Sequence, residues 1–309
     1  MLAKADTRHS RATRARAKEA KITNFDSIER LVSECDYILS IVPPSDAYSN
    51  ARGISLALQG NRHARRTPLV FLELNAISPR TAKTIADLFR GLPAIFIDGG
   101  IIGGPPRLKS KPNDDDDVPP EWIRPNIPLS GPKQLIYAPT SGPHLAAALN
   151  SRHISNEIGK ASGLKMCFAA TTKGFSAILI QSFTTASSLG VLEDLKKEMR
   201  DMNPQALIGA ERSLPSIPPK AYRWVREMEE IADTFSEEGG FEEQLFLGVA
   251  QVYKTMAEDT VLGDERFGDR ERGTTLDDLA EAMKEGLFIT QGDGAADDGN
   301  DPGKNHIEG

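Results

Sequence analysis

The sequence predicts an α/β domain built on a parallel sheet, followed by an all-helical domain. Between Asn24 and Pro139, short apolar runs alternate with segments of helical periodicity. This order is typical of parallel strands joined by right-handed helical crossovers. Between residues 161 and 285, helical patterns follow one another with almost no strand signal. We expect the first domain at 1–150 and the second at 151–288.

Three apolar runs predict the strands of the sheet. The runs are DYILSIV at 36–42, PLVFLEL at 68–74 and AIFID at 94–98. Since the runs are apolar at nearly every position, both faces of these strands are expected to be buried under helices. The helical segments between them are expected to begin at Ser45 and at Ser78, the latter followed by Pro79 at the first helical position.

The helical domain is predicted from three segments. Segment 162–190 is long, apolar and rich in small residues, which favours a helix buried on most sides at close approach to its neighbours. Segments 221–235 and 241–259 carry apolar side chains at helical spacing, with charged side chains opposite. The first of these stripes consists of Trp224, Met228, Ile231 and Phe235. Such a stripe is more typical of a core than of a cofactor site.

Two polar segments stand outside this pattern. Segment 107–126 holds four consecutive aspartates between prolines and predicts an insertion loop. An unbroken acidic run is more typical of a solvated loop than of a divalent-metal site, so no metal site is expected. Residues 289–309 are rich in glycine and aspartate with few apolar groups, which predicts a disordered acidic tail.

The first 21 residues carry seven Lys and Arg side chains against Asp6 and Glu19. Three interpretations are open: a mitochondrial presequence, a nucleic-acid-binding arm, or a solvated basic helix. The near absence of an apolar face favours the solvated helix.

Composition narrows the class of protein. Of the 309 residues, 39% are hydrophobic and 26% are charged, which fits a globular protein with a substantial core. No run approaches the roughly 18 apolar residues of a membrane span, and the net charge of −7 argues against nucleic acid as a partner. Cys35 and Cys167 lie far apart without metal-ligand spacing. We therefore expect a cytoplasmic protein with a small-molecule partner, and neither a membrane nor nucleic acid.

The segments that follow the three strands are the candidate ligand-binding residues. In parallel α/β sheets, ligands bind beyond the carboxyl ends of the strands. The segments are 43–45, 75–78 and 98–104, of which the last reads DGGIIGG. Glycine allows a ligand to approach the backbone closely because it has no Cβ, so these glycines are expected to clear space for a ligand.

At these positions the sequence resembles the β-hydroxyacid dehydrogenases, the family of 3-hydroxyisobutyrate and 6-phosphogluconate dehydrogenases. The matching segments are VPP (42–44) for the family's strand-end L-P, NAISP (75–79) for its S-T-I-x-P turn, DGGIIGG (98–104) for its D-x-x-V-S-G-G substrate loop, and IPLSGP (127–132) for the strand that follows. The helical part is similar to the C-terminal domain of phosphogluconate-dehydrogenase-like proteins.

The resemblance implies a Rossmann-type dinucleotide-binding domain joined to a helical substrate and dimerisation domain. It implies an NADP-dependent oxidoreductase that transfers hydride to or from a small hydroxy acid or a related carbonyl compound, as a homodimer. NAD is less favoured than NADP, because RHSRAT (8–13) is similar to the family's turn in which an arginine binds the 2′-phosphate of NADP.

The resemblance also assigns roles to individual residues. The expected cofactor-binding residues are Arg8 or Arg11, Val42, Pro43, Pro44, Asn75, Ala76 and Ile77. The expected substrate-binding residues are Gly100, Ile101, Ile102, Gly103, Gly104, Thr172 and Lys173.

Lys165 is the expected catalytic acid or base. The segment KMCFAATTKG (165–174) aligns with the family's K-M-x-H-N-x-x-E-Y-G through Lys165, Met166 and Gly174. A lysine flanked by apolar side chains such as Leu164 and Phe168 is expected to be desolvated, which favours the neutral amine and suits proton transfer. Lys173 is the rival for this role.

Other polar positions of the family pattern are lost. The histidine falls on Phe168, the asparagine on Ala169, the glutamate on Thr172, and the serine of the substrate loop on Ile102. Oxidative decarboxylation of 6-phosphogluconate is therefore not expected, and a bulkier or less polar substrate is.

The family's opening strand with G-x-G-x-x-G, whose helix N-terminus binds pyrophosphate, does not occur before Asp36. We expect an incomplete dinucleotide domain and weak or absent cofactor binding by this chain. The alternative is a non-catalytic remnant that retains only the helical assembly domain.

Overall fold

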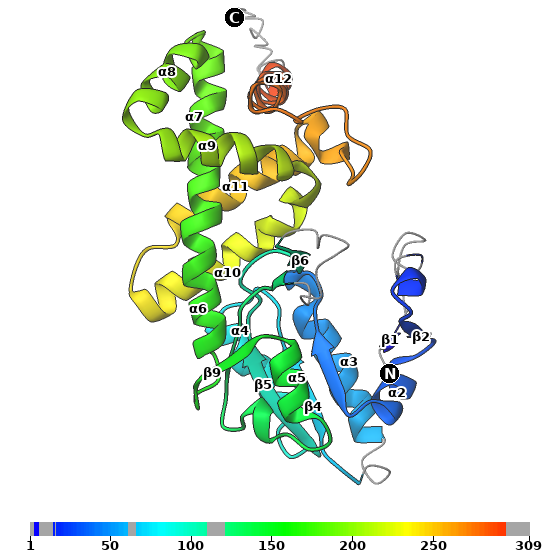
Figure 1. Cartoon of the computed structure of the whole chain (residues 1–309). Helices are drawn as coiled ribbons and strands as arrows, with labels where there is room; N and C mark the ends of the chain where they lie inside the picture. Colours follow the sequence, from blue (N-terminus) through cyan, green and yellow to red (C-terminus); the bar gives the residue numbers. More distant parts are fainter. Residues whose placement is uncertain (1–2, 6–14, 16, 61–65, 110–120, 295–309) are drawn as a thin grey trace, which may run out of the picture. The chain divides into compact units, whose positions relative to one another are not determined.

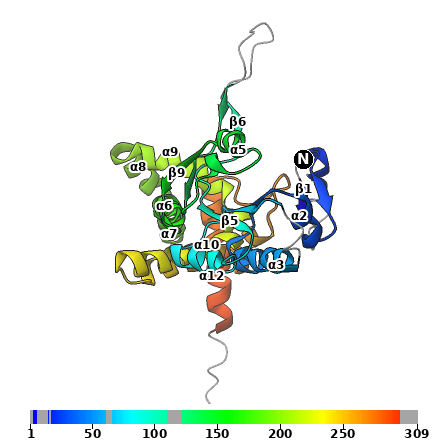
Figure 2. The same ribbon diagram turned by 90° about the horizontal axis from the view of Figure 1, so that it is seen from below.

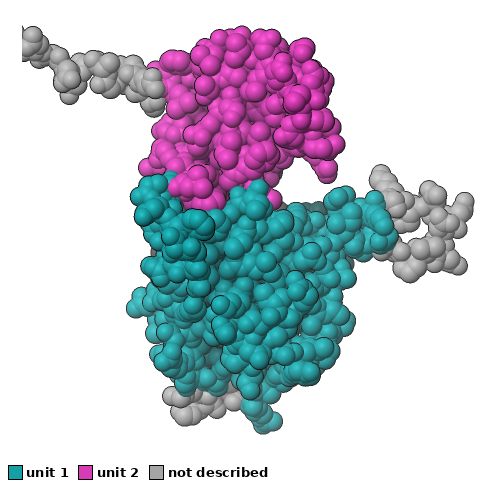
Figure 3. Space-filling model, turned by 90° about the vertical axis from the view of Figure 1, so that its left-hand side faces the viewer, with its two compact units in different colours: residues 1–171, 229–244 teal, residues 172–228, 245–309 magenta. Residues whose placement is uncertain are grey.

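The computed structural model describes residues 3–5, 15, 17–60, 66–109 and 121–294. The chain divides into two compact units (Figures 1 and 3). Unit 1 contains Met1–Thr171 and Glu229–Gln244, and unit 2 contains Thr172–Met228 and Leu245–Gly309.

Unit 1 is built on a five-stranded sheet. The strands, in spatial order, are β3 (Tyr37–Ser40), β4 (Leu69–Glu73), β5 (Ala94–Gly99), β8 (Ile127–Ser130) and β9 (Ser151–Ser155). The first three pair in parallel, which confirms the three predicted strands and the predicted parallel sheet. β8 runs antiparallel to β5, and β9 runs parallel to β8, so the sheet extends past residue 150.

Helices cover both faces of this sheet, as the apolar runs predict. β5 lies between α3 (Ala47–Gly60) on one side and α5 (Gly142–Ala148) on the other (Figures 1 and 2). Alternate residues of β4 enter separate cores: Leu69 and Phe71 pack with α2 (Ile28–Glu34), α3 and α4 (Pro79–Asp87), while Val70 and Leu72 pack on the α5 side. The strand is therefore buried at every position.

The two expected helix caps have different outcomes. The Oγ of Ser78 accepts a hydrogen bond of 3.1 Å from the backbone N–H of Thr81, which confirms it as the N-cap of α4. The prediction that Ser45 caps α3 is wrong. The chain already enters a 3₁₀ turn at Pro44–Asp46, and the hydroxyl of Ser45 donates to Asp46 instead.

Two further strand pairs lie outside the main sheet. β1 (Ala3–Ala5) pairs in parallel with β2 (Thr23–Phe25). In the predicted insertion, β6 (Arg107–Leu108) and β7 (Trp122–Ile123) form a short antiparallel pair. The four aspartates between them lie outside the described residues.

The helices that follow the sheet confirm the predicted all-helical part. They are α6 (Lys160–Ala169), a π-helical turn (Ala170–Gly174), α7 (Phe175–Leu189), α8 (Leu192–Met202), α9 (Pro204–Ser213), α10 (Ala221–Gly239), α11 (Gln244–Glu258) and α12 (Leu276–Gly294). α12 continues past residue 288, where the tail was expected to begin. None of the described helices combines the length and apolar character that crossing a bilayer requires.

The expectation that segment 162–190 is buried on most sides is wrong for this chain alone. The exposed apolar side chains are Leu164 and Phe168 on α6, Phe175, Ile178 and Leu189 on α7, and Val191 before α8. Each of the two helices therefore presents apolar side chains to solvent.

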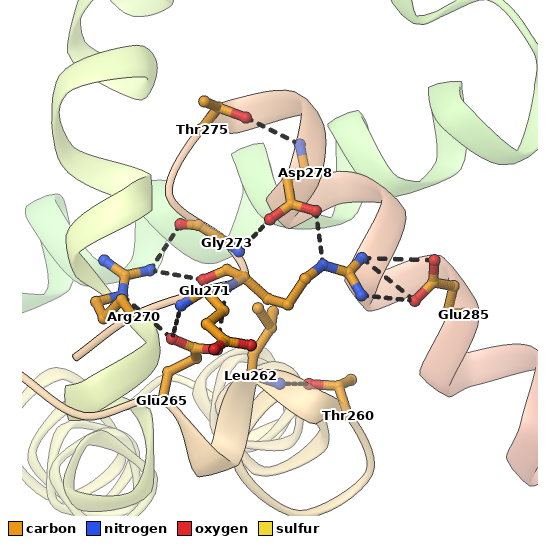
Figure 4. Close-up of polar contacts among 10 residues, drawn as sticks. Thr260, Leu262, Glu265, Arg270, Glu271, Gly273, Thr275, Asp278 and Glu285 are labelled. Atoms are coloured by element: carbon orange, nitrogen blue, oxygen red, sulfur yellow. Dashed lines mark hydrogen bonds and ion pairs between the residues drawn. The ribbon is translucent and has the colours of Figure 1, made fainter.

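The loop before α12 has a defined hydrogen-bond pattern in unit 2 (Figure 4). Glu265 accepts the backbone N–H groups of Glu271 and Arg272 at 2.9 and 3.0 Å. Gly273 has φ +64°, and a Cβ there would lie 2.7 Å from a methyl group of Leu262. Arg270 is held in the loop by its own hydrogen bonds to the carbonyl oxygens of Pro215, Arg272 and Gly273.

Candidate functional site

The segments predicted to bind the cofactor and the substrate leave the same edge of the sheet. In the parallel register, Ser40 pairs with Glu73, and Glu73 pairs with Asp98. The segments that begin at Val42, Asn75 and Gly100 therefore start side by side at the carboxyl ends of β3, β4 and β5. This is the edge at which parallel α/β sheets bind ligands.

Asn75 ties two of these strand ends together. Its Oδ1 accepts the backbone N–H of Val42 at 2.7 Å, and its Nδ2 donates to Ser40 Oγ at 2.9 Å and to Glu73 Oε1. Ser40 also accepts from Asn50 Nδ2 on α3 at 3.1 Å. The Asn75 side chain is only 3% exposed, so it shapes this edge from within.

The other predicted cofactor residues differ in exposure. Pro43 is exposed, Val42, Pro44 and Ala76 are half-buried, and Ile77 is fully buried in the core. The available surface at this edge therefore comes from the two prolines and Ala76. Arg8 and Arg11, the predicted contacts to a 2′-phosphate, lie outside the described residues.

Glu73 is a buried carboxyl group beneath this edge. Its Oε1 accepts from Asn75 N at 3.0 Å and from Asn75 Nδ2. Its Oε2 is buried and has no hydrogen-bond partner in the part of the chain that the structure describes. Burial raises the pKa of Glu73 to about 7, although the hydrogen bonds from Asn75 and Ser40 act against the rise. The carboxylate of Asp98 on the neighbouring strand adds to it.

Asp98 joins β5 to the start of α6. Its Oδ2 accepts backbone N–H groups of Gly159, Ala161 and Ser162 at 3.0, 3.2 and 3.2 Å, and the hydroxyl of Ser130 at 2.7 Å. Its Oδ1 accepts the Ser162 hydroxyl at 2.5 Å. Burial raises the pKa of Asp98, and these hydrogen bonds oppose that rise. Since the first N–H groups of a helix have no partner within it, a carboxylate there fixes the helix to the strand.

This junction places Lys165 directly over the predicted substrate loop. A Cβ built on Gly100 would lie 2.7 Å from Lys165 Cβ and 3.1 Å from its Cγ. Lys165 itself is half-buried. Its neighbours Leu164 and Phe168 are 39% and 43% exposed, so they do not desolvate it as expected. The backbone of the glycine loop covers the stem of the lysine instead.

The expectation that the glycines of DGGIIGG clear space for a ligand is wrong for Gly99 and Gly100, the first two of the four. A Cβ on Gly99 would lie 2.6 Å from Leu74 Cδ2 and 2.7 Å from Leu129 Cδ2. Gly99 therefore makes room for core side chains, and Gly100 for the lysine stem. Gly104 is exposed, and a Cβ there would meet nothing within 4 Å.

The middle of the loop is held by main-chain contacts. Ile102 exchanges two backbone hydrogen bonds of 2.9 Å with Asn126. Gly103 has φ +121°, in the region that favours glycine, and lies against Pro125. Ile101 packs partly into the core beneath the loop. Ile102, Gly103 and Gly104 therefore belong to a turn that main-chain contacts hold in place.

Thr172 and Lys173 lie in the π-helical turn, at the start of unit 2. Thr172 is exposed. Lys173 forms an ion pair with buried Glu227, and its Nζ lies 4.8 Å from the centre of the Trp224 ring. Tyr253 donates to the carbonyl oxygen of Lys173 at 2.6 Å. The side chain of Lys173 is thus part of a buried charged and aromatic cluster, which distinguishes it from Lys165.

Sequence reasoning missed the buried acids that position the site. Asp98 was noted only as the start of a glycine loop, and Glu230 not at all. Glu230 accepts from Ser78 N and from Thr81 Oγ1, both at 2.8 Å, at the start of α4. It lies on α10 beside Ile231, within an otherwise charged stretch. A carboxylate next to Ile231 of the apolar stripe was the available signal. The residues that it binds, Ser78 and Thr81, are distant in the sequence.

The described residues fit only part of a dinucleotide. The edge at Pro43, Pro44 and Ala76 is the surface at which the sequence predicts contacts to such a molecule. None of the described strand-to-helix turns combines a glycine-rich stretch with free backbone N–H groups at a helix N-terminus. The prolines after β3 have no N–H, and the N–H of Ser78 is bound to Glu230. Among the described strand-to-helix turns, none therefore offers a site for the pyrophosphate.

Comparison with known proteins confirms the predicted fold. Residues 186–256 match the model of a domain of unknown function, DUF1932. No curated protein matches the sequence. The structure is similar to a conserved hypothetical protein from Sinorhizobium meliloti, with a TM-score of 0.56 and 20% identity, over 93% of this chain and 88% of that one.

Two named dehydrogenases share the fold. The structure is similar to 3-hydroxyisobutyrate dehydrogenase from Mycobacterium tuberculosis, with a TM-score of 0.54 and 14% identity, over 89% of this chain and 88% of that one. It is also similar to 3-hydroxyisobutyrate dehydrogenase from Salmonella typhimurium, with a TM-score of 0.53 and 14% identity, over 90% of each chain. The chain therefore has the fold of the hydroxyacid dehydrogenases, with a sheet domain followed by a helical domain.

The raised pKa of Glu73 predicts how stability depends on pH. The folded state holds this proton up to about pH 7, whereas the unfolded chain releases it near pH 4.3. The free energy of unfolding should therefore fall between those two pH values, by about 4 kcal/mol at 1.36 kcal/mol per pKa unit. Glu73→Gln should remove this fall, so the variant should be more stable than the parent at pH 8 and similar to it at pH 4.5.

Urea unfolding at the two pH values checks this. Glu211→Gln is the control, since Glu211 is an exposed glutamate on α9. Equal stability of Glu73→Gln and the parent at pH 8 would show that the buried carboxyl carries no such penalty.

Proposed function

We propose that the chain is an NADP-linked oxidoreductase that acts on a small hydroxy acid or a related carbonyl compound, with Lys165 as the acid or base. The observation that carries the proposal is the contact between the Lys165 stem and Gly100. It puts the stem of an ionisable side chain against the glycine loop, at the edge where parallel α/β sheets bind ligands, in a chain with a hydroxyacid dehydrogenase fold.

Lys165 would move one proton in this reaction. In the direction of oxidation, its neutral amine would take the proton of the substrate hydroxyl. In the direction of reduction, its ammonium would return a proton to the carbonyl oxygen. The cofactor, when bound, would supply or accept the hydride.

The surroundings of Lys165 support a substrate of low polarity. Ile102 stands in the loop where the family has serine, and Phe168 and Ala169 stand on α6 where it has histidine and asparagine. The substrate would contact Ile102, Gly103 and Gly104, with few side-chain hydrogen bonds.

The free thiols of Cys35 and Cys167 agree with a cytoplasmic location.

Substitution of Lys165 tests the catalytic proposal. Lys165→Met should lower turnover by about 10²-fold or more, since a general acid or base contributes this much. Lys160→Met is the matched control, because Lys160 is exposed at the start of the same helix. Turnover is measured with full-length chain and a panel of small 3-hydroxy acids, at NADP concentrations above its dissociation constant.

For this chain we expect that dissociation constant to be about 1 mM or weaker, which corresponds to about −4 kcal/mol. A parent-like rate for Lys165→Met would refute the role of the lysine. Absence of turnover in the parent across the panel would favour the alternative of a non-catalytic remnant. Micromolar binding of NADPH, by fluorescence titration, would show a phosphate site beyond the described turns.

We also propose that the protein is a homodimer assembled through the exposed face of α7. Phe175, Ile178 and Leu189 are 46%, 52% and 71% exposed on this helix. A groove of about 420 Å³ runs beside them, and its lining residues are Gln181, Ser182, Thr185, Ala186, Leu189, Val191 and Leu195. Exposed large apolar side chains around a groove are typical of protein interfaces.

Ile178→Glu should convert the dimer to a monomer, because it places a charge in the centre of the apolar face. Light scattering of the purified chain gives the mass directly. Leu56→Glu is the control and should leave the mass unchanged, because Leu56 is an exposed residue of α3 in unit 1. A parent that is monomeric at micromolar concentration contradicts the proposal.

A further inference from the structure

Unit 2 contains a basic cluster that the proposed function does not use, formed by Lys220, Arg223 and Arg270. Lys220 ends the 3₁₀ turn Pro218–Lys220, and Arg223 lies in the first turn of α10. Arg223 lies in segment 221–235, which sequence analysis treated only as an amphipathic helix, and Lys220 immediately precedes that segment. The cluster lies entirely within one compact unit.

Lys220 is a half-buried cation without an ionic partner in the described part of the chain. Its Nζ donates to Ser216 Oγ at 3.1 Å and lies 5.7 Å from the centre of the Trp224 ring. Both contacts are uncharged, so neither neutralises the ammonium. Burial lowers the pKa of Lys220, and the charges of Arg223 and Arg270 lower it further. The charge is therefore unfavourable where it stands.

Arg223 adds a second unneutralised charge. Its side chain is exposed, and it makes no hydrogen bond or ion pair with another described residue. The first turn of α10 contains no acidic side chain. Helix N-termini ordinarily favour acidic residues, because the helix dipole is positive there. Two cations at this end of a 19-residue helix therefore repel both the dipole and each other.

The nearby acidic groups already have partners. Glu265 lies 3.9 Å from Arg270 Nε and accepts the backbone N–H groups of two other residues (Figure 4). Arg270 also donates to the carbonyl oxygens of Pro215, Arg272 and Gly273. Glu227, which lies on α10 one turn beyond Arg223, is paired with Lys173. Among the described residues, Lys220 and Arg223 are thus left without an acidic partner.

We propose that Lys220 and Arg223 form a binding site for the phosphate group of a small molecule. A phosphate monoester carries close to two negative charges at neutral pH, so a single group neutralises both cations. A carboxylate carries one charge and would leave the other unpaired. Arg223 can donate two parallel hydrogen bonds to phosphate oxygens, and Lys220 has donor capacity beyond Ser216.

This inference stands apart from the proposed oxidoreductase activity, because the site needs neither Lys165 nor a dinucleotide. The phosphate could belong to a phosphorylated metabolite or to the 2′-phosphate of NADP. The chemistry of recognition is the same for both sources, and competition separates them.

Isothermal titration calorimetry of the full chain with inorganic phosphate tests the proposal, with sodium chloride of equal ionic strength as the reference. We expect saturable binding with a dissociation constant of about 1 mM or tighter. Lys220→Met and Arg223→Met should each weaken it by about tenfold or more. Lys254→Met is the control, because this exposed lysine on α11 is paired with Glu258, and it should bind like the parent.

Arg223 is exposed, so its substitution keeps the test valid if Lys220→Met fails to fold. No binding above the chloride reference would overturn the proposal. So would an equal loss in Lys254→Met, since that indicates unspecific attraction. Displacement of bound phosphate by NADPH but not by NADH would assign the site to the 2′-phosphate. Displacement by glycerol 3-phosphate, with NADPH inactive, would assign it to a phosphorylated metabolite.

Discussion

The carboxylate of Asp98 is the interaction on which the candidate site depends. Asp98 lies next to the last residue of β5. Its carboxylate accepts five hydrogen bonds, three of them from the first backbone N–H groups around the start of α6. Hydrogen bonds to a charged group contribute about 1.5–3 kcal/mol each in favourable cases. They fix the direction in which α6 leaves the sheet, and Lys165 lies in the second turn of that helix. The position of the lysine over Gly100 follows from this junction rather than from its apolar neighbours.

A line of buried polar groups continues this junction across the carboxyl ends of the strands. Ser40, Asn75 and Glu73 connect β3 with β4, and Glu73 is the register neighbour of Asp98 on β5. In a buried environment such a network is strong where it is satisfied and costly where it is not. Glu73 Oε2 is the one buried oxygen of this line that has no described partner, and the pKa of Glu73 is raised accordingly. These side chains are buried beneath the edge of the sheet, so a ligand could bind at the edge without displacing them.

The sequence predicted the elements of the sheet better than the contacts between them. β4 was predictable because a run that is apolar at nearly every position indicates a strand buried on both faces. Ser78 was predictable as the cap of α4 because a serine before proline is a local signal for the start of a helix. β8 was predicted only through a family motif, and its antiparallel direction was not foreseen, because direction depends on where the insertion at 107–126 returns the chain. Lys165 was predicted from the family motif. The reason given for its environment was wrong, because the residue that covers it, Gly100, lies 65 positions away in the sequence. Asp98 and Glu230 escaped notice for the same reason: their partners are non-local.

Urea unfolding of Gly100→Ala and Gly104→Ala tests most directly whether α6 holds the stem of Lys165 against the glycine loop at Gly100. The added methyl at residue 100 would lie 2.7 Å from Lys165 Cβ, while at residue 104 it would meet nothing within 4 Å. We predict that Gly100→Ala lowers the free energy of unfolding by about 1–3 kcal/mol, as overpacking does, and that Gly104→Ala changes it by less than about 0.5 kcal/mol. In an Asp98→Asn background, where α6 is less firmly held, the effect of Gly100→Ala should become smaller. Equal effects of the two glycine substitutions, or an unchanged effect of Gly100→Ala when Asp98 is replaced, would contradict the account.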